Sequence, residues 1–207
     1  MRVLLLNGSP REKGCTYTAL AEVAKAINDE GIETTIFHIG NKAVQGCIDC
    51  RACKDSLRCI FNDDHVNEAI TLLTKADGLV VGSPVYFAGP CGALCSFLDR
   101  MFYLKSHLYA YKPAAAVVNC RRGGASSAFD RLNKYFTISN MPVVSSQYWN
   151  STHGTTVEEV LQDLEGLQTM RTLGRNMAWM LKGLTIAAED IDLPKPEHPR
   201  QRTNFIR

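Results

Sequence analysis

Four of the eight cysteines in the chain fall within one short segment, with the pattern C-x2-C-x2-C-x5-C at Cys47, Cys50, Cys53 and Cys59. Three cysteines at intervals of three residues, with a fourth close behind, allow one wrapped loop to bring four thiolates to a 4Fe-4S cluster, although the spacing differs from the bacterial ferredoxin pattern. Zinc is a weaker alternative, because zinc sites made of four cysteines usually contain two separated C-x2-C pairs. A loop with free thiols is the third alternative, and the segment alone leaves all three open.

Three other cysteines have a different setting. Cys91 and Cys95 lie one helical turn apart beside small residues, and Cys120 ends an apolar run. A free cysteine often packs as a small hydrophobic side chain. We therefore predict that these three are buried structural residues.

The composition indicates a globular protein with a small-molecule partner. The chain has 207 residues, of which 45% are hydrophobic and 21% charged, as expected for one domain. A formal net charge of +2, with both signs mixed along the chain, predicts neither nucleic-acid nor membrane binding. The apolar run after Met1 is too short for a signal or a membrane span, so we expect a soluble cytoplasmic protein. In that reducing compartment, closely spaced cysteines are more often metal ligands or catalytic thiols than disulfides.

Apolar runs alternate with helical periodicity along the chain. Strands are predicted at residues 2–6, 33–38, 78–81, 114–118 and 143–146. The predicted helices include one capped by Asp63 and Asp64, and a long one that opens with a capping box at Thr156 and Glu159 and runs to about residue 181. This alternation predicts an α/β fold with a doubly wound, five-stranded parallel sheet and helices on both faces. The domain would span residues 1–190, with a cysteine-rich insertion at 45–62 and a tail at 191–207.

Ligands of such sheets bind outside the carboxyl ends of the strands. The loop after the first strand runs into a helix and contains Ser9, Arg11, Gly14, Cys15 and Thr16. Backbone amides at a helix N-terminus, with hydroxyl donors, form a site for a phosphate. Neither G-x-x-x-x-G-K-[ST] nor G-x-G-x-x-G is present, so a monophosphate such as that of FMN fits better than a nucleoside triphosphate or a dinucleotide. The alternative is an ordinary turn with a capping threonine.

Three motifs together resemble one protein family. They are Asn-Gly-Ser-Pro-Arg at 7–11 followed by Gly-Cys-Thr at 14–16, Gly-Ser-Pro-Val-Tyr-Phe at 82–87, and Ser-Phe-Leu-Asp-Arg at 96–100. In this order they resemble the NAD(P)H-dependent FMN reductase group of flavodoxin-like proteins, over about residues 1–150. With the cysteine segment, the chain is similar to the iron-sulfur flavoproteins of that group. Cys15 departs from the pattern, because the family usually has asparagine there.

The resemblance implies a flavodoxin-like strand order of 2-1-3-4-5 and a set of FMN contacts. Ser9, Arg11, Cys15 and Thr16 would hold the phosphate, with Gly14 allowing close backbone approach. Residues after the third strand would follow the ribityl chain and the ring edge, namely Pro84, Val85, Tyr86 and Phe87. The alternative for Tyr86 and Phe87 is a core aromatic pair.

A third wall of the site is expected after the fourth strand, at Arg121, Arg122, Gly123 and Gly124. A cation there stabilises the negative charge of a reduced flavin ring. Because adjacent side chains on an extended chain diverge, only one of the two arginines faces the ring. The lone His153 is interpreted as a surface residue, with a catalytic role as the alternative. Flavin chemistry needs no protein nucleophile.

Our principal hypothesis is an FMN-dependent oxidoreductase that passes reducing equivalents from NAD(P)H to a quinone, a flavin or an electron-poor aromatic compound. One alternative is an electron carrier whose FMN and possible 4Fe-4S cluster exchange electrons with ferredoxin. Another is a non-catalytic flavin-binding or metal-sensing module. Relatives of this kind commonly form homodimers or homotetramers, and the long helix, Tyr148-Trp149 and Phe205-Ile206 are a candidate interface.

Overall fold

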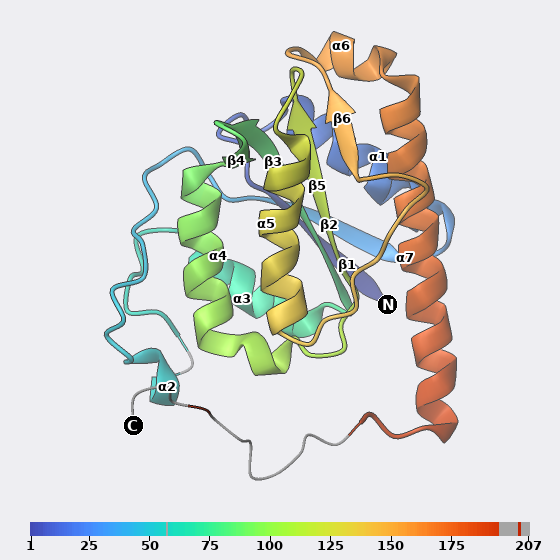
Figure 1. Ribbon diagram of the computed structural model, residues 1–207. Coiled ribbons are helices and arrows are strands. Elements are labelled where there is room, and N and C mark those ends of the chain that lie inside the picture. The colour runs from blue at the N-terminus through green and yellow to red at the C-terminus, as the bar shows by residue number, and fades with distance from the viewer. Residues whose placement is uncertain (57, 195–202, 204–207) are drawn as a thin grey trace.

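A parallel sheet forms the centre of the computed structural model, which describes residues 1–56, 58–194 and 203 (Figure 1). Its strands run in the order β2-β1-β3-β5-β6, and every neighbouring pair is parallel. The two-residue β4 pairs antiparallel with the end of β3 as a short hairpin. The strand bounds are β1 Arg2–Asn7, β2 Glu33–His38, β3 Gly78–Tyr86, β4 Gly89–Pro90, β5 Ala114–Cys120 and β6 Ser151–His153.

Helices cover both faces of the sheet. The long helices on one face are α1 (Cys15–Asp29) and α7 (Leu164–Asp190), and those on the other are α3 (Val66–Lys75), α4 (Gly92–Lys105) and α5 (Ala125–Ile138) (Figure 1). The short ones are α2 (Cys53–Ser56), α6 (Val157–Gln162) and the 3-10 turn Ser106–Leu108. Strand residues alternate between the two cores: Val3 and Leu5 face α1 and α7, whereas Leu4 and Leu6 face α3, α4 and α5.

The predicted α/β class is confirmed, and five parallel strands are present, but the fifth is not where the sequence places it. Val143 makes only an isolated bridge to Ala114, and the paired strand is β6, at Ser151–His153. Between the two, the Asn150 side chain donates to the Ala116 carbonyl at 3.0 Å. The side chain thus bonds a β5 carbonyl that a backbone amide of a neighbouring strand would otherwise bond. The backbone between Val143 and Ser151 leaves the sheet, and pairing with β5 resumes at β6.

The predicted long helix is divided in two. The capping box is present, because Thr156 Oγ1 accepts from the Glu159 amide at 3.3 Å and the Glu159 carboxylate accepts from the Thr155 amide at 2.6 Å. Asp163 then leaves the helical region with φ −76° and ψ 76°, and its carboxylate accepts from the Gly166 amide at 2.9 Å. The aspartate thus ends α6 and caps α7.

None of the helices in the described part of the chain combines the length and the apolar character needed to cross a bilayer. Phe205 and Ile206, predicted to lie at an interface, fall outside the described residues. Cys91 and Cys120 are buried as predicted, and Cys95 is half-buried.

Gly174 allows the close crossing of α1 and α7. A Cβ atom at this position would lie 2.6 Å from the Cβ of Ala26 and 2.7 Å from the carbonyl oxygen of Val23. Both separations are shorter than van der Waals contact, so no larger residue fits without moving one helix.

We predict that Gly174→Ala lowers the free energy of unfolding by about 1–3 kcal/mol, because the added methyl overpacks the α1–α7 contact. The matched control is Gly183→Ala in the same helix, where a Cβ would meet nothing within 4 Å. That change should stabilise the protein by about 0.5–1 kcal/mol, because alanine favours a helix. Urea unfolding measures both. Equal stabilisation by the two variants would contradict the close crossing.

Candidate functional site

A cleft of about 220 Å³ lies at the carboxyl ends of the strands. The last residues of β3 and β5 and the segments that follow β1, β5 and β6 form its walls, as expected for a doubly wound sheet. The lining residues are Ser9, Arg11, Cys15, Thr16, Pro84, Val85, Tyr86, Asn119, Cys120, Arg121, Gly154 and Thr155. The structure thus brings together residues of the three walls predicted from the sequence, around 9–16, 84–87 and 121–124, whereas the motif at 96–100 lies outside the cleft lining.

Asn7, at the end of β1, holds the first loop. Its side-chain oxygen accepts from the Ser9 amide at 3.1 Å, and its side-chain nitrogen donates to the Glu12 carbonyl at 2.8 Å. Ser9 Oγ in turn accepts from the Arg11 amide at 3.1 Å. Asn7 is fully buried, so the loop keeps this shape without a ligand.

Thr16, in the first turn of α1, has a buried hydroxyl with no hydrogen-bond partner among the described residues. A buried polar group left without a partner costs about 1–3 kcal/mol. The helix begins after Gly14, which has no side chain to cap the first amides. The unpartnered hydroxyl and the helix N-terminus therefore form a site that an anionic ligand would complete.

Two neighbours of Thr16 shape the same loop. Gly14 does not line the cleft. A Cβ at this position would lie 3.1 Å from the Cβ of Arg11, so glycine here allows the backbone to lie close to the Arg11 side chain. Cys15 lines the cleft and is half-buried. Burial raises the pKa of the Cys15 thiol, which therefore stays neutral at physiological pH.

Pro84, Val85 and Tyr86 line the cleft, whereas Phe87 lies just beyond it. Tyr86 is 47% exposed and Phe87 is fully exposed, which excludes the alternative of a core aromatic pair. Phe87 and Ala88 have φ values of 49° and 60°, a left-handed conformation that is strained for side chains larger than glycine. The hairpin therefore presents an exposed aromatic tip beside the cleft.

The third wall uses one arginine of the predicted pair. Arg121 lines the cleft and Arg122 does not. Gly123 and Gly124 also lie outside the lining. Gly124 has φ 86°, and a Cβ there would lie 2.8 Å from the Cα of Ala88, so it lets this loop pack against the β3–β4 hairpin.

Asn119, Cys120, Gly154 and Thr155 also line the cleft and were not predicted from the sequence. Asn119 donates to the carbonyl and the hydroxyl of Thr152 at 3.2 and 3.1 Å, which joins β5 to β6. Gly154 and Thr155 follow β6, whose position the strand pattern did not reveal. His153 pairs with Asp163 at 3.5 Å and lies outside the cleft lining.

The four cysteines of the insertion line one small cavity of about 20 Å³, on the side of α4. Cys47 and Cys50 are exposed, and Cys53 and Cys59 are half-buried. Burial raises the pKa of the Cys53 thiol, and the three nearby thiols raise it further. Four sulfurs around one mostly apolar hollow are a donor set suited to an iron-sulfur cluster.

No group of three or more histidine, cysteine, aspartate or glutamate side chains lies within metal-binding distance in the described part of the chain. The cysteines are therefore gathered but not yet in the arrangement of a bound cluster. Their role as ligands stays a prediction.

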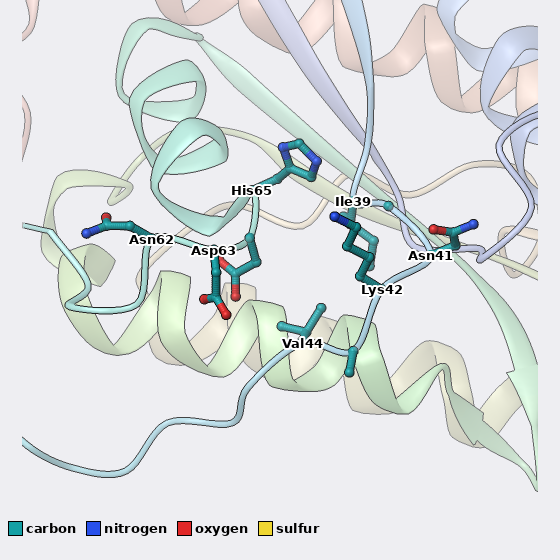
Figure 2. A pocket seen from close by; sticks show the side chains of 10 residues that line it. Ile39, Asn41, Lys42, Val44, Asn62, Asp63 and His65 are labelled. Atoms are coloured by element: carbon teal, nitrogen blue, oxygen red, sulfur yellow. The ribbon is translucent and has the colours of Figure 1, made fainter.

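A further hollow of about 350 Å³ lies between the segment that follows β2 and the segment that precedes α3 (Figure 2). Residues 39–44 form one side and residues 62–65 the other. None of the residues predicted to contact FMN or metal lines it.

Comparison with known proteins identifies the family. Residues 1–156 match the NADPH-dependent FMN reductases. The chain is 33% identical over 193 residues to an iron-sulfur flavoprotein of Methanocaldococcus jannaschii, with 88% of this chain and 98% of that protein covered. The resemblance inferred from the motifs is confirmed.

Solved structures show the same fold. A WrbA-like flavodoxin from Agrobacterium tumefaciens has a TM-score of 0.60 at 17% identity, covering 88% of this chain and 96% of that one. An NAD(P)H:quinone oxidoreductase from Methanothermobacter marburgensis has a TM-score of 0.65 at 16% identity, covering 86% and 96%. The predicted flavodoxin-like fold and oxidoreductase class are confirmed. Because the family match extends over most of the chain, the protein belongs to the NADPH-dependent FMN reductase family.

Proposed function

We propose that the cleft binds FMN and that the protein is an oxidoreductase that passes reducing equivalents from NAD(P)H to a small acceptor. The observation that carries this proposal is the buried hydroxyl of Thr16 at the N-terminus of α1, which has no hydrogen-bond partner within the part of the chain that the structure describes. A buried hydroxyl in this position is suited to donate to a ligand oxygen, beside the first amides of α1 that Gly14 leaves uncapped.

Ser9, Arg11, Cys15 and Thr16 would hold the FMN phosphate. Thr16 supplies a neutral donor, and the first amides of α1 supply the positive end of the helix dipole. Arg11 is exposed beside the cleft and adds a full positive charge. The neutral thiol of Cys15 introduces no repulsion, so the departure from asparagine is compatible with phosphate at this position.

Pro84, Val85, Tyr86 and Phe87 would contact the ribityl chain and the ring. The cleft volume of about 220 Å³ is smaller than the roughly 300–1,000 Å³ of typical small-molecule pockets. A bound flavin would therefore extend over the exposed aromatic tip. The exposed Tyr86 and Phe87 also provide a surface that a second subunit of a homodimer or homotetramer would cover.

Arg121 would place positive charge at the third wall, where it favours an anionic ring over a neutral one. No histidine lines the described cleft, and the proposed chemistry needs none. Bound FMN supplies hydride acceptance and one-electron transfer, while the protein positions and polarises it. An acceptor would use the same open side of the cleft.

A second candidate function is favoured by the cysteine cavity and by the relative named above. We propose that Cys47, Cys50, Cys53 and Cys59 hold a 4Fe-4S cluster. A one-electron centre of that kind would allow exchange with ferredoxin in place of, or in addition to, a small acceptor. Both candidates use the same FMN site.

The two candidates are separated by anaerobic purification followed by flavin, iron and sulfide analysis and by steady-state assays. Turnover of NAD(P)H with a quinone supports the first candidate, and reduction only by ferredoxin supports the second. FMN without iron under strict anaerobiosis would remove the cluster, and protein that binds no FMN would contradict both.

We expect Thr16→Val to raise the dissociation constant of FMN about tenfold or more, because a hydrogen bond to a charged phosphate contributes about 1.5–3 kcal/mol. The ligand-free variant should be at least as stable as wild type, since an unsatisfied hydroxyl is removed. The control is Thr18→Val, two residues along the same helix, whose hydroxyl donates to the Gly14 carbonyl at 3.2 Å. It should lose about 0.5–1.5 kcal/mol of stability and keep FMN affinity. Fluorescence titration and urea unfolding distinguish them; equal FMN affinity in both variants would refute the phosphate site.

Arg121→Gln should weaken the binding of reduced FMN more than that of oxidised FMN. The ratio of the two dissociation constants, reduced to oxidised, should rise about tenfold, because one nearby charge contributes about 1–2 kcal/mol. Arg122→Gln makes the same chemical change one residue away, outside the cleft, and should leave the ratio near that of wild type. A redox titration of bound FMN measures the ratio. If Arg122→Gln has the larger effect, the assignment of the third wall is wrong.

A further inference from the structure

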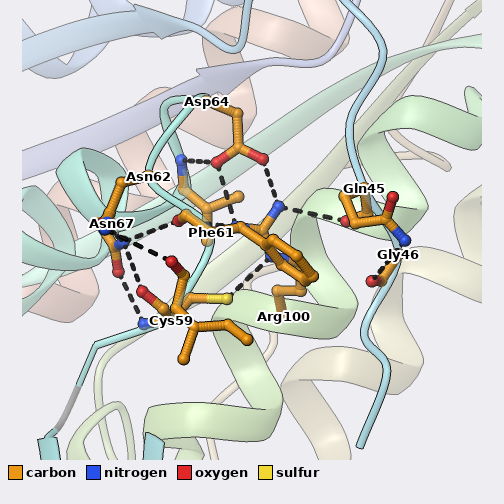
Figure 3. Close-up of polar contacts among 10 residues, drawn as sticks. Gln45, Gly46, Cys59, Phe61, Asn62, Asp64, Asn67 and Arg100 are labelled. Carbon is orange, nitrogen blue, oxygen red and sulfur yellow. Dashed lines mark hydrogen bonds and ion pairs between the residues drawn. The ribbon is translucent and has the colours of Figure 1, made fainter. Parts of the chain in front are cut away.

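Arg100 carries a buried guanidinium at the centre of a polar network beside the cysteine cavity (Figure 3). The residue belongs to α4 and is 2% exposed. Its Nε donates to Cys59 Sγ at 3.2 Å. Its terminal nitrogens donate to the Gln45 carbonyl at 3.2 Å and the Phe61 carbonyl at 3.3 Å, and both also bond the Asp64 carboxylate.

These contacts join the two arms of the cysteine segment. Gln45 precedes Cys47, whereas Phe61 and Asp64 follow Cys59. The guanidinium also lies 5.1 Å from the centre of the Phe61 ring. One side chain of α4 therefore contacts both the residues before Cys47 and the residues after Cys59.

Other side chains hold the same segment. Tyr103, three residues after Arg100 on α4, donates to the Asp49 carboxylate between Cys47 and Cys50. Asn67 of α3 donates to the Cys59 carbonyl at 3.0 Å and accepts from the Cys59 amide at 2.9 Å. The position of Cys59 is thus determined by protein contacts that need no metal.

Burial of the guanidinium has a cost that the network offsets. A buried charge is tolerated only when it is paired and hydrogen-bonded, and the Arg100 and Asp64 side chains are 1% and 8% exposed. The carboxylate and two carbonyls satisfy the terminal nitrogens, yet Nε is directed at a sulfur. Among the contacts of Arg100 with described residues, this donation is the one that would act directly on the sulfur of a cluster ligand.

We propose that Arg100 is a positioning residue that places Cys59 and, through the Nε–H···Sγ hydrogen bond, raises the reduction potential of the cluster. Hydrogen bonds to cluster sulfurs and the net local charge are main determinants of that potential, because each stabilises the added electron. Asp64 opposes the effect by partly neutralising the guanidinium. The inference rests on the proposed cluster and goes beyond it by assigning a residue that is not a ligand.

The charges of Arg100 and Asp64 predict opposite shifts of the cluster reduction potential in two variants. Arg100→Gln removes the cation and should lower the cluster potential, whereas Asp64→Asn leaves the cation unneutralised and should raise it. Each shift should change the ratio of reduced to oxidised cluster about tenfold at a fixed ambient potential. A purely structural role would move both variants in the same direction.

The experiment uses the full chain, reconstituted anaerobically with iron and sulfide, with iron analysis and a redox titration followed by electron paramagnetic resonance. Arg131→Gln is the control, because Arg131 stacks on Tyr135 and pairs with Asp99 at 3.6 Å, away from the cysteine segment. The cluster of the Arg131→Gln variant should have the same reduction potential as the wild-type cluster. Arg100→Lys keeps the charge but not the fork of donors, so it should lose iron faster than wild type to a chelator.

Wild-type protein without iron would overturn the cluster proposal, and this inference with it. Wild-type protein with iron, combined with an unchanged Arg100→Gln potential, would overturn the inference alone. If Arg100→Gln retains no iron, the sign of the Asp64→Asn shift decides: an increase supports the proposal, and a decrease or no change refutes it. Loss of iron from both variants alike would indicate a structural role only, and would refute the tuning of the potential.

Discussion

The hydrogen bond from the Gly8 amide to the Gly82 carbonyl, 2.8 Å long, is the contact on which the geometry of the cleft depends. It joins the first residue after β1 to the middle of β3, where the loop after β1 leaves the sheet. A Cβ at Gly8 would lie 2.4 Å from Leu94 Cδ2, and one at Gly82 would lie 2.7 Å from Leu20 Cδ1. Helices α1 and α4 therefore press on this junction from opposite faces of the sheet, and glycine at both positions lets the start of the first loop lie directly against β3.

Helix α4 connects the cleft to the cysteine segment. At its start, the Cys91 amide donates to Ser83 Oγ at 2.9 Å, which ties the helix to β3. Further along, Arg100 and Tyr103 hold the cysteine segment. Because a helix is rigid over this length, the cleft and the cysteine cavity keep a defined relation to each other. The proposed FMN and cluster would need such a relation, since electron transfer between two redox centres requires a stable separation.

The two regions differ in how they treat buried polar groups. At the cleft, the Thr16 hydroxyl is left without a partner among the described residues, and Arg11 and Arg121 are exposed. At the cysteine segment, the Arg100 guanidinium is bonded on every nitrogen. The first arrangement leaves free energy to be gained on binding a ligand, whereas the second maintains a shape before any ligand arrives.

Local sequence determined the features that depend on near neighbours in the chain. The apolar runs of β1, β3 and β5, the β-branched and aromatic residues of β2, and the passage from β1 through Ser9 and Arg11 to Thr16 all involve residues that are close together in the chain. Their pattern therefore predicts both the elements and the lining of the first loop. Tertiary structure decided the rest. The position of β6 depends on the Asn150 side chain reaching Ala116, and the choice of Arg121 over Arg122 depends on which way β5 ends. The pairing of Arg100 with Asp64, 36 residues away, depends on how α4 packs against the insertion. Contacts between distant residues depend on the packing and burial of the whole chain, so the residue pattern of a single segment does not predict them.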